Sequence, residues 1–241
     1  MRFPSPLRAG RLIKRYKRFL ADVAFEDGTE VTAHCANPGS MMGLSTPGMP
    51  VWLSRSESKT RKLPFSLELV EVDGVLTAIN TGNPNKLAEE ALRRGAIPEL
   101  AGYADLARER KYGENSRIDI LLSDPAHAQR RRPDCYVEIK NVHLVREPGL
   151  AEFPDSVTTR GAKHLAELTR VVAAGGRAVM LYIVQRGDCR RLRPAADLDP
   201  AYADALIKAT DAGVETLCYD CDVTTEEIVV RRALPVDVGA R

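Results

Sequence analysis

The chain has 241 residues, of which 44% are hydrophobic and 28% charged, and a formal net charge of +2. These are ordinary values for a globular protein, and no apolar run is long enough to span a bilayer or to resemble a signal peptide. The five cysteines are scattered along the chain, which excludes a disulfide framework and fits reduced thiols. The composition therefore predicts a cytoplasmic protein without membrane association.

The first 80 residues have the pattern of a small β-domain. Alternating or wholly apolar runs predict six short strands, at Leu12–Tyr16, Phe19–Phe25, Val31–Cys35, Pro50–Leu53, Phe65–Val72 and Val75–Asn80. Asp-Gly pairs at 27–28 and 73–74 are typical of hairpin turns, whereas residues 37–48 predict a long irregular connection. Strands of this number and length suit a closed barrel, either an OB-fold or an SH3-like barrel.

From residue 81 the pattern changes to helices alternating with strands. A helix is expected at Lys86–Arg94, with Asn83 as its cap and Gly95 at its end. The later elements are a helix at 157–174 capped by Asp155, a strand at 178–184, a helix from Asp199 to Gly213 and a strand at 214–219. This order predicts an α/β domain with a mixed sheet.

Two apolar stretches before the long helix carry the residues that point to chemistry. Asp119 directly precedes one stretch, at 120–122, and Glu138 and Lys140 lie inside the other, at 135–142. Both stretches predict short buried strands that lie side by side. Because side chains alternate along a strand, Glu138 and Lys140 share one face, which Asp119 joins if the strands pair.

This combination predicts a divalent-metal site with nuclease chemistry. The carboxylates of Asp119 and Glu138 are hard oxygen ligands of the kind that Mg²⁺ or Mn²⁺ prefers. Lys140 beside them can orient a water molecule, or help to deprotonate it, for attack on a phosphodiester. The alternative is a solvated strand face, on which Glu138 and Lys140 form an ordinary surface ion pair.

Basic residues gather in three places, although the net charge is small. The clusters are the first 20 residues, which contain seven Lys or Arg and no acidic residue, Arg130–Arg132, and Arg186, Arg190, Arg191 and Arg193. Such clusters favour a polyanion, and we expect a nucleic acid. In the first cluster Tyr16 is expected to stack on bases beside Arg15, Lys17 and Arg18, and Phe19 is expected in the core.

Two further groups each leave two interpretations open. Arg160 and His164 are four residues apart on the expected helix 157–174, with Lys163 beside them. They form either a phosphate clamp over the metal site or a solvated helix face. Cys218 and Cys221 have the spacing of half a zinc site, but without a second pair they are expected to be reduced thiols on a strand.

Seven short motifs, in order along almost the whole chain, resemble those of the sugar fermentation stimulation protein family. They are Arg15–Phe19, His34–Met41, Ser116–Asp119, Glu138–Val142, Phe153–Asp155, Thr159–Leu165 and Val184–Arg186. Each motif is weak alone, and their joint occurrence is specific.

The resemblance implies an N-terminal OB-fold at 1–80 and a C-terminal domain at 81–241 similar to PD-(D/E)XK nucleases. It also implies a DNA-binding protein linked to the regulation of sugar metabolism. By motif, Gln185 would lie near the core of Asp119, Glu138 and Lys140, and Arg117 and Arg186 would join the residues expected to bind DNA. The resemblance leaves two functions open, a Mg²⁺-dependent nuclease and a DNA-binding regulator that keeps only the nuclease fold.

Overall fold

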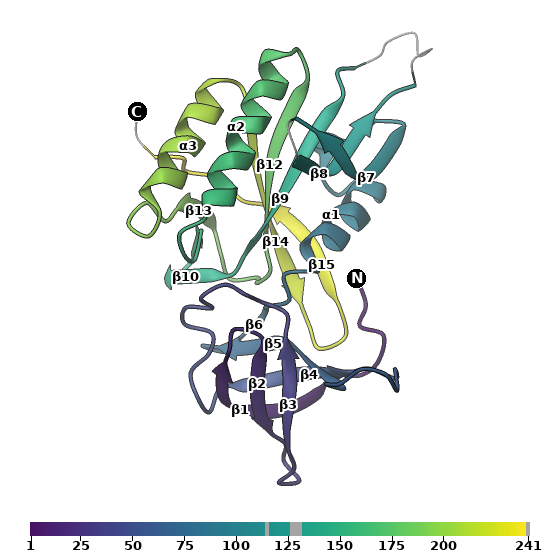
Figure 1. Ribbon diagram of the computed structural model, residues 1–241, viewed down its shortest axis with the longest axis vertical. Coiled ribbons are helices and arrows are strands. Elements are labelled where there is room, and N and C mark those ends of the chain that lie inside the picture. Colours follow the sequence, from purple (N-terminus) through teal and green to yellow (C-terminus); the bar gives the residue numbers. More distant parts are fainter. Residues whose placement is uncertain (114–115, 126–131, 240–241) are drawn as a thin grey trace.

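The computed structural model describes residues 1–113, 116–125 and 132–239. Its elements form a β-barrel and, above it in Figure 1, a sheet flanked by helices. Within these residues, no helix combines the length and hydropathy that crossing a bilayer requires. Arg130 and Arg131, from the second basic cluster of the sequence, lie outside the described residues.

The N-terminal unit is a barrel of five mutually paired strands with a sixth strand at its side. Its strands are β1 (Arg8–Tyr16), β2 (Leu20–Ala24), β3 (Glu30–Cys35), β4 (Pro50–Arg55), β5 (Phe65–Val72) and β6 (Val75–Ala78). β1 pairs with β2 and β4, and β5 pairs with β4, β6 and, in parallel, β3. The β3–β5 pairing closes the ring, which is the topology of an OB-fold and not that of an SH3-like barrel.

The hairpin turns of the barrel follow their expected chemistry. Asp73 and Gly74 have φ values of 52° and 75°, as a two-residue turn of the primed type requires. In the other turn Gly28 has a φ of 81°, and the Thr29 amide donates to Asp27 Oδ1 at 2.9 Å. All six strands expected here are present, with ends shifted by up to four residues.

The second unit has a six-stranded sheet in the order β15-β14-β12-β9-β8-β7. The strands are β7 (Asp105–Tyr112), β8 (Ser116–Ser123), β9 (Cys135–Val142), β12 (Arg177–Val184), β14 (Glu215–Val223) and β15 (Ile228–Ala233). β9, β12 and β14 are parallel, and the outer strands are antiparallel to their neighbours. This is the mixed sheet that the sequence predicts.

Helices cover the two faces of this sheet. α2 (Thr159–Ala173) and α3 (Pro200–Asp211) pack on one face, and α1 (Pro84–Arg93) lies on the other (Figure 1). β12 is buried from Ala178 to Val184, which explains its continuous apolar sequence. Asp199 caps α3 by accepting from the Tyr202 amide at 3.0 Å, as expected.

Several elements have no signal in the sequence. They are the 3-10 helix Pro98–Leu100, the edge strands β7 and β15, and a small sheet of β10 (Leu144–Glu147), β11 (Leu150–Phe153) and β13 (Arg191–Pro194). β7 is largely exposed and charged, so it lacks the alternation that marks a half-buried strand. The short strands of the small sheet have only four residues each.

The cap of α2 is Thr158, and the expectation of Asp155 at this position is wrong. The Thr158 hydroxyl accepts from the Gly161 amide at 3.1 Å. The carboxylate of Asp155 is instead turned to the barrel, where it accepts from the Met41 amide and the Ser40 hydroxyl, both at 3.1 Å. A residue with the right side chain for a cap thus serves as a link between the two units.

The barrel and the sheet share one hydrophobic core. Leu69 of β5 and Ala78 of β6 belong to the same buried cluster as Leu87 of α1 and Val179 and Leu181 of β12. The Ala78 amide also donates to the backbone carbonyl of Gln185 at 2.9 Å. Apolar packing and backbone hydrogen bonding therefore fix the barrel against the second unit.

We expect Asp155→Ala to lower the free energy of unfolding by about 1–3 kcal/mol at neutral pH, because the Met41 amide loses its acceptor and His143 its carboxylate partner. The Ser40 hydroxyl keeps the backbone carbonyl of residue 155 as an acceptor. Urea denaturation measures this change. The exposed carboxylate of Asp204 on α3 provides the control, since Asp204→Ala removes none of these contacts.

The effect of Asp155→Ala should depend on pH. Burial raises the pKa of Asp155, but the hydrogen bond and charge of His143 and the Met41 amide outweigh it and lower the pKa from 3.8 to about 2. A lowered folded-state pKa stabilises the fold above the unfolded value, and this stabilisation is lost as the pH falls through about 2. The difference between wild type and variant should therefore narrow below pH 3.8, and a constant difference would contradict the assignment.

Candidate metal centre

The centre is built where strands β8 and β9 separate. Their pairing covers only Ile120–Leu122 and Cys135–Val137. One residue further, Asp119 Oδ2 accepts from the Ile139 amide at 2.8 Å, in place of the next ladder hydrogen bond. Asp119 Oδ1 accepts from the side-chain amide of Asn85, on α1, at 2.9 Å. The carboxylate therefore lies between the two strands and the helix.

On β9, Glu138 and Lys140 project to the side of α2, as alternation predicts. Glu138 is 2% exposed, and the Lys140 ammonium donates to its Oε1 at 2.8 Å. His164 of α2 reaches the same oxygen through Nδ1, which lies 3.2 Å from the Lys140 nitrogen. This buried, three-membered contact excludes the solvated surface ion pair that the sequence left as an alternative.

The two carboxylates have opposite pKa shifts. Burial, followed by the nearby charge of Glu138, raises the pKa of Asp119, and the Ile139 hydrogen bond offsets this in part. For Glu138 burial also raises the pKa, but the His164 hydrogen bond and the Lys140 charge outweigh it, so the pKa is lowered. Glu138 is therefore ionised at neutral pH, whereas burial and the charge of Glu138 disfavour the ionised form of Asp119 more than its hydrogen bonds and Lys140 favour it.

The second carboxylate oxygen of Glu138, Oε2, has the surroundings of a cation ligand. Oε2 is buried and has no hydrogen-bond partner among the residues that the structure describes, which is costly for a charged group unless a cation or water satisfies it. No group of three His, Cys, Asp or Glu side chains is arranged to hold a metal within the described part of the chain. Asp119 and Glu138 would thus leave positions to water, as Mg²⁺ sites usually do.

Helix α2 contributes to the centre itself, and not only the phosphate clamp that the spacing of Arg160 and His164 suggested. Arg160 Nε donates to His164 Nε2 at 3.3 Å, while the opposite ring nitrogen of His164 contacts Glu138. His164 is buried and already paired, so it positions Glu138, which in turn holds Lys140, and does not itself face a phosphate. Arg160 and Lys163 are exposed on the outer side of the helix.

Gln185 and Arg186 do not join the centre. The register sets Tyr182 opposite Lys140, and Gln185 lies three residues further along β12 and its extension. Its amide donates to Asn141 Oδ1 at 2.7 Å and to the Asn80 carbonyl at 3.3 Å, at the junction with the barrel. Arg186 is 4% exposed and forms a two-point ion pair with Asp188, so it offers no DNA-binding surface here.

In the basic turn of the barrel, only some of the side chains expected to contact DNA are available to a ligand. Two nitrogens of the Arg15 guanidinium donate to four backbone carbonyls, among them Asn37 and Gly39 at 2.8 Å, and so order the following loop. Tyr16 is half-buried, and its hydroxyl donates to Asp22. Phe19 is 48% exposed, so its assignment to the core is wrong.

Lys17 and Arg18 form the turn itself, with φ values of 49° and 64°. Both side chains are exposed, and Arg18 Nε donates to the Pro38 carbonyl at 3.1 Å. Arg117 is exposed on β8, two residues before Asp119. The turn and the edge of β8 therefore carry cations that solvent and large ligands can reach.

Three residues near the centre were missed from the sequence. Asn85 follows the helix-starting Pro84, and nothing in the sequence ties it to Asp119. Tyr112 ends the charged strand β7, which itself gave no signal. Glu167 is 3% exposed and lies one helical turn after His164. Its i, i+3 spacing was a signal that could have found it.

The five cysteines are all free and buried, including Cys218 and Cys221 on β14. They are reduced thiols, as the missing second pair of ligands indicates.

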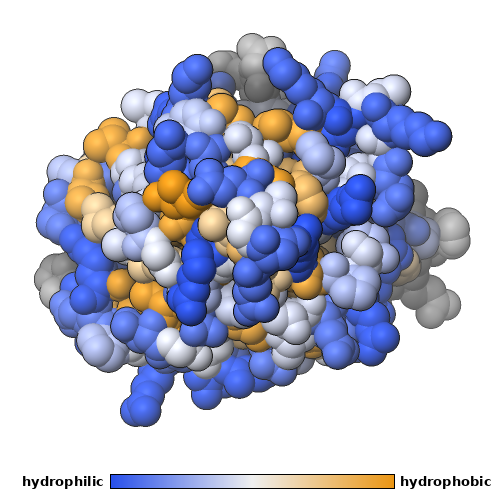
Figure 2. Space-filling model, turned by 90° about the horizontal axis from the view of Figure 1, so that it is seen from below, coloured by the Kyte–Doolittle hydropathy of each residue, from blue (hydrophilic) through white to orange (hydrophobic). Residues whose placement is uncertain are grey.

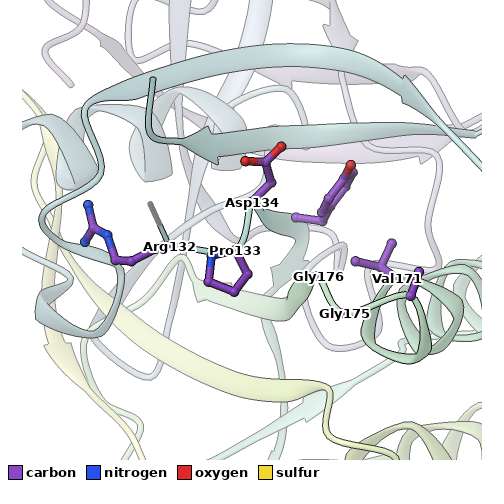
Figure 3. Close-up of a pocket in the computed structure, with 8 residues that line it drawn as sticks. Arg132, Pro133, Asp134, Val171, Gly175 and Gly176 are labelled. Atoms are coloured by element: carbon purple, nitrogen blue, oxygen red, sulfur yellow. The ribbon is translucent and has the colours of Figure 1, made fainter. Parts of the chain in front are cut away.

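A wide hollow of about 520 Å³ lies elsewhere on the second unit. Residues from the start of β9 and the end of α2 line it, among them Arg132, Asp134, Val171 and Gly175 (Figure 3). The lining contains none of the residues of the candidate centre. Size alone therefore does not locate the chemistry in this fold.

A closed OB-type barrel, joined to a mixed sheet with one buried and one half-buried carboxylate at a strand separation, defines a protein with a nuclease-like second domain. Two family models match the chain in agreement with this. One, described as the SfsA N-terminal OB domain, matches residues 13–79, and the other, the sugar fermentation stimulation protein RE domain, matches residues 82–227. The chain belongs to the sugar fermentation stimulation protein family.

Curated relatives match the chain along nearly its full length. A sugar fermentation stimulation protein homolog of Rhodospirillum centenum is 59% identical over 234 residues, which are 97% of this chain and 98% of the relative. A homolog of Maricaulis maris is 56% identical over 239 residues, or 99% of this chain and 100% of the relative.

A solved structure, that of Pyrococcus furiosus SfsA in complex with Ca²⁺, has the same architecture. It superposes with a TM-score of 0.86 at 27% sequence identity, and the match covers 98% of each chain.

The electrostatics of Asp119 predict that Asp119→Asn stabilises the metal-free protein by about 1 kcal/mol at neutral pH, because it removes a destabilised charge. A raised folded-state pKa means that the folded carboxylate holds its proton better than the unfolded one, so ionisation above that pKa opposes folding. Thermal or urea unfolding in a chelating buffer measures the change. A loss of stability comparable to that of Asp119→Ala would show that the hydrogen bonds of Asp119 matter more than its charge.

Proposed function

We propose that this protein is a DNA-binding nuclease that hydrolyses phosphodiesters with Mg²⁺ or Mn²⁺. The observation that carries the proposal is the state of Glu138. One of its oxygens is held by Lys140 and His164, and the other is buried without a partner in the described part of the chain. A carboxylate fixed in this way, next to Asp119, whose charge is disfavoured by burial and by Glu138, is suited to hold a divalent cation.

Asp119 and Glu138 are the proposed ligands. The relative from Pyrococcus furiosus was solved in complex with Ca²⁺, which supports a divalent-cation site in the shared fold. A divalent cation, when bound, offsets the negative charge that develops on a phosphate during hydrolysis. Ca²⁺, a hard cation with flexible coordination, commonly takes the same oxygen ligands as Mg²⁺.

The chain's own residues have separate roles in this proposal. Lys140 presents a positive charge 2.8 Å from Glu138 and orients the attacking water. His164 donates through Nδ1 to Glu138, Arg160 donates to the other ring nitrogen, and Glu138 in turn holds Lys140. In the reaction a water oxygen bonds to phosphorus, the bond to the leaving oxygen breaks, and a proton reaches that oxygen.

DNA contacts are proposed on the exposed cations near the centre and on the barrel turn. They are Lys17, Arg18, Arg117, Arg160 and Lys163, with Tyr16 and the exposed Phe19 as candidate stacking surfaces. Hydrophilic side chains dominate the barrel end of the molecule, with small separate apolar areas between them (Figure 2). This mixture suits a ligand with phosphates outside and bases that stack.

The cleavage experiment incubates supercoiled and single-stranded DNA with Mn²⁺ or Mg²⁺. Wild type should nick DNA, and Asp119→Ala and Glu138→Ala should lose both nicking and at least tenfold in calorimetric metal affinity, or about 1.4 kcal/mol. Lys140→Ala should retain metal binding and lose nicking, because the lysine acts on water and not on the ion. The exposed Lys208→Ala, on α3, is the matched control.

A non-catalytic DNA-binding regulator is the second candidate. The relatives are named for stimulating sugar fermentation, an effect that a regulator would also produce. In that case DNA affinity should not depend on Ca²⁺, Asp119→Ala should bind DNA at least as tightly as wild type, and no Mn²⁺-dependent nicking should occur. Ca²⁺-strengthened binding that Asp119→Ala abolishes would favour the nuclease.

DNA affinity should fall steeply with salt, because phosphate contacts release counterions. Replacing Lys17 and Arg18 with Ala should flatten the slope of log K against log salt by about two units. Arg15→Ala is a poor probe, since its guanidinium holds the loop at 37–40. Fluorescence anisotropy measures the slopes, and an unchanged slope would move the DNA surface to Arg117, Arg160 and Lys163.

A further inference from the structure

A small pocket lies where the barrel meets the end of β9 and the small sheet. Its volume is about 200 Å³, and its lining comes from the loop after β3, from Thr81 and from β9 to β11 with the residues that adjoin them. An engineered protein cavity of about 150 Å³ holds one benzene molecule, so this pocket has room for one six-membered ring with its substituents. Pro38 and Thr81 are exposed parts of the lining, which places the mouth of the pocket at the surface.

A hydrogen-bond network fixes which ring nitrogen of His143, a residue of the lining, carries the proton. The carbonyl of Asn80 can only accept, so Gln185 presents its amide nitrogen to it, at 3.3 Å, and also to Asn141 Oδ1, at 2.7 Å. The side-chain nitrogen of Asn141 then faces His143 Nδ1 at 3.1 Å and donates to it. Because Nδ1 accepts, the proton of the neutral imidazole is assigned to Nε2.

This Nε2 proton is not used well within the protein. His143 is 5% exposed, and its Nε2 has no hydrogen bond of normal length among the described residues. Asp155 Oδ2, also in the lining, lies 3.5 Å away and already accepts from the Met41 amide at 3.1 Å. A buried donor without a good acceptor is costly. A ligand with an acceptor next to a donor would satisfy the imidazole and the carboxylate together.

The charges of the lining select a neutral ligand. Asp155 and Glu152 contribute carboxylates, and none of the described residues of the lining is a Lys or Arg, so a phosphate would be repelled. Both oxygens of Glu152 accept from the Arg146 guanidinium, at 2.6 and 2.8 Å, and are not available to a cation. The rest of the lining includes apolar side chains. They are Pro38, Val142, Leu144 and Phe153.

The barrel wall of the pocket is held by the basic turn that we propose as a DNA contact. Arg15 donates to the carbonyls of Asn37 and Gly39 at 2.8 Å. Arg18 Nε donates to the Pro38 carbonyl at 3.1 Å. A strand whose phosphates contact this turn therefore passes the mouth of the pocket.

The pocket also lies near the candidate metal centre along β9. His143 follows the last residue of the strand and is three positions beyond Lys140, which is about 10 Å along an extended chain. A few nucleotides of one strand span such a distance, so one DNA strand can reach both places.

Large apolar side chains are exposed on segments next to the lining. They are Phe19 in the basic turn, Met42 in the loop after β3 and Val157 before α2. Exposed apolar and aromatic surfaces beside cations are typical of sites that bind single strands, because bases can stack on them.

We propose that the pocket receives one unstacked pyrimidine base of a single-stranded DNA segment. His143 Nε2 donates to an acceptor on the edge of the base, and Asp155 accepts from the neighbouring N–H. Cytosine and thymine each have an acceptor and a donor side by side on this edge. The inference rests on the DNA-binding part of the proposed function, because the basic turn brings the strand to the pocket.

The pocket has a consequence for the class of substrate. A base in a duplex has to leave its stack before it can enter, whereas a base in a single strand is already accessible. Single strands, and duplexes with unpaired ends, are therefore the expected substrates of the centre.

The test measures fluorescence anisotropy of the full chain with two labelled strands, in Ca²⁺ so that neither is cut. One is a strand of about 12 thymidines, within the site size of an OB-fold, and the other has the same number of phosphates and no bases. Wild type should bind the thymidine strand about tenfold more tightly than the abasic strand.

Two variants probe the pocket in different ways. His143→Phe removes the donor and keeps a ring, and Thr81→Leu lengthens a side chain at the mouth without adding charge. Each should lower the affinity for the thymidine strand about fivefold and leave the affinity for the abasic strand unchanged, which also shows that the variant is folded. Thr225→Leu, at an exposed position in the turn between β14 and β15, is the matched control and should bind both strands as wild type does.

The outcomes separate this inference from the proposed nuclease. Equal wild-type affinity for the two strands would overturn the base pocket, while nicking in Mn²⁺ would leave the nuclease standing. Base-dependent binding without nicking would do the reverse. No binding of either strand would overturn both.

Two further results would overturn the pocket and replace it with another assignment. A base-dependent affinity that neither variant changes would assign base recognition to Tyr16 and Phe19. Free thymidine that binds as tightly as the strand, and is weakened by both variants, would show a nucleoside site and not a site for DNA.

Discussion

The burial of Glu138 is the constraint on which the rest of the centre depends. An ionised carboxylate cannot be placed under a helix unless it is paired, and here the pairing needs both its own strand and α2. Lys140 follows two residues along β9, while His164 requires α2 to lie across the sheet at one rotation about its axis. Arg160 then fixes the far side of the imidazole. The helix position, the strand register and the charge state of the centre are therefore coupled.

A second constraint is the separation of β8 from β9. In paired strands the backbone amides normally donate to carbonyls of the neighbouring strand. The Ile139 amide instead donates to the side chain of Asp119. This substitution opens the sheet without leaving a donor unpaired. It also holds a carboxylate where burial and Glu138 disfavour its charge. The fold thus stores electrostatic strain at the position where a cation would relieve it, a common trade of stability for function.

The sequence predicted those parts of the structure that depend on local pattern. Alternation placed Glu138 and Lys140 on one face, and the apolar run at 178–184 marked a strand buried on both sides. The contacts that single residues make with distant parts of the chain could not be predicted from the sequence. Asp155 has the sequence position of a cap but bonds across the domain junction, and Phe19 alternates like a core residue but lies at a turn. Gln185 and Arg186 are residue types that often occur in nuclease sites. The strand register and their hydrogen bonds to Asn141 and Asp188 direct them away from the centre.

The core shared by the barrel and the sheet has an evolutionary consequence. Leu69 and Ala78 pack in one cluster with Leu87 and Val179, so a change of volume on either side has to be matched on the other. Two domains joined only by a linker can be exchanged separately between genes. If either of these two domains were joined to a different domain, the apolar surface that it now buries against the other would be exposed. The pair is thus expected to be inherited as a unit, and the relatives that match 97% or more of this chain are consistent with that.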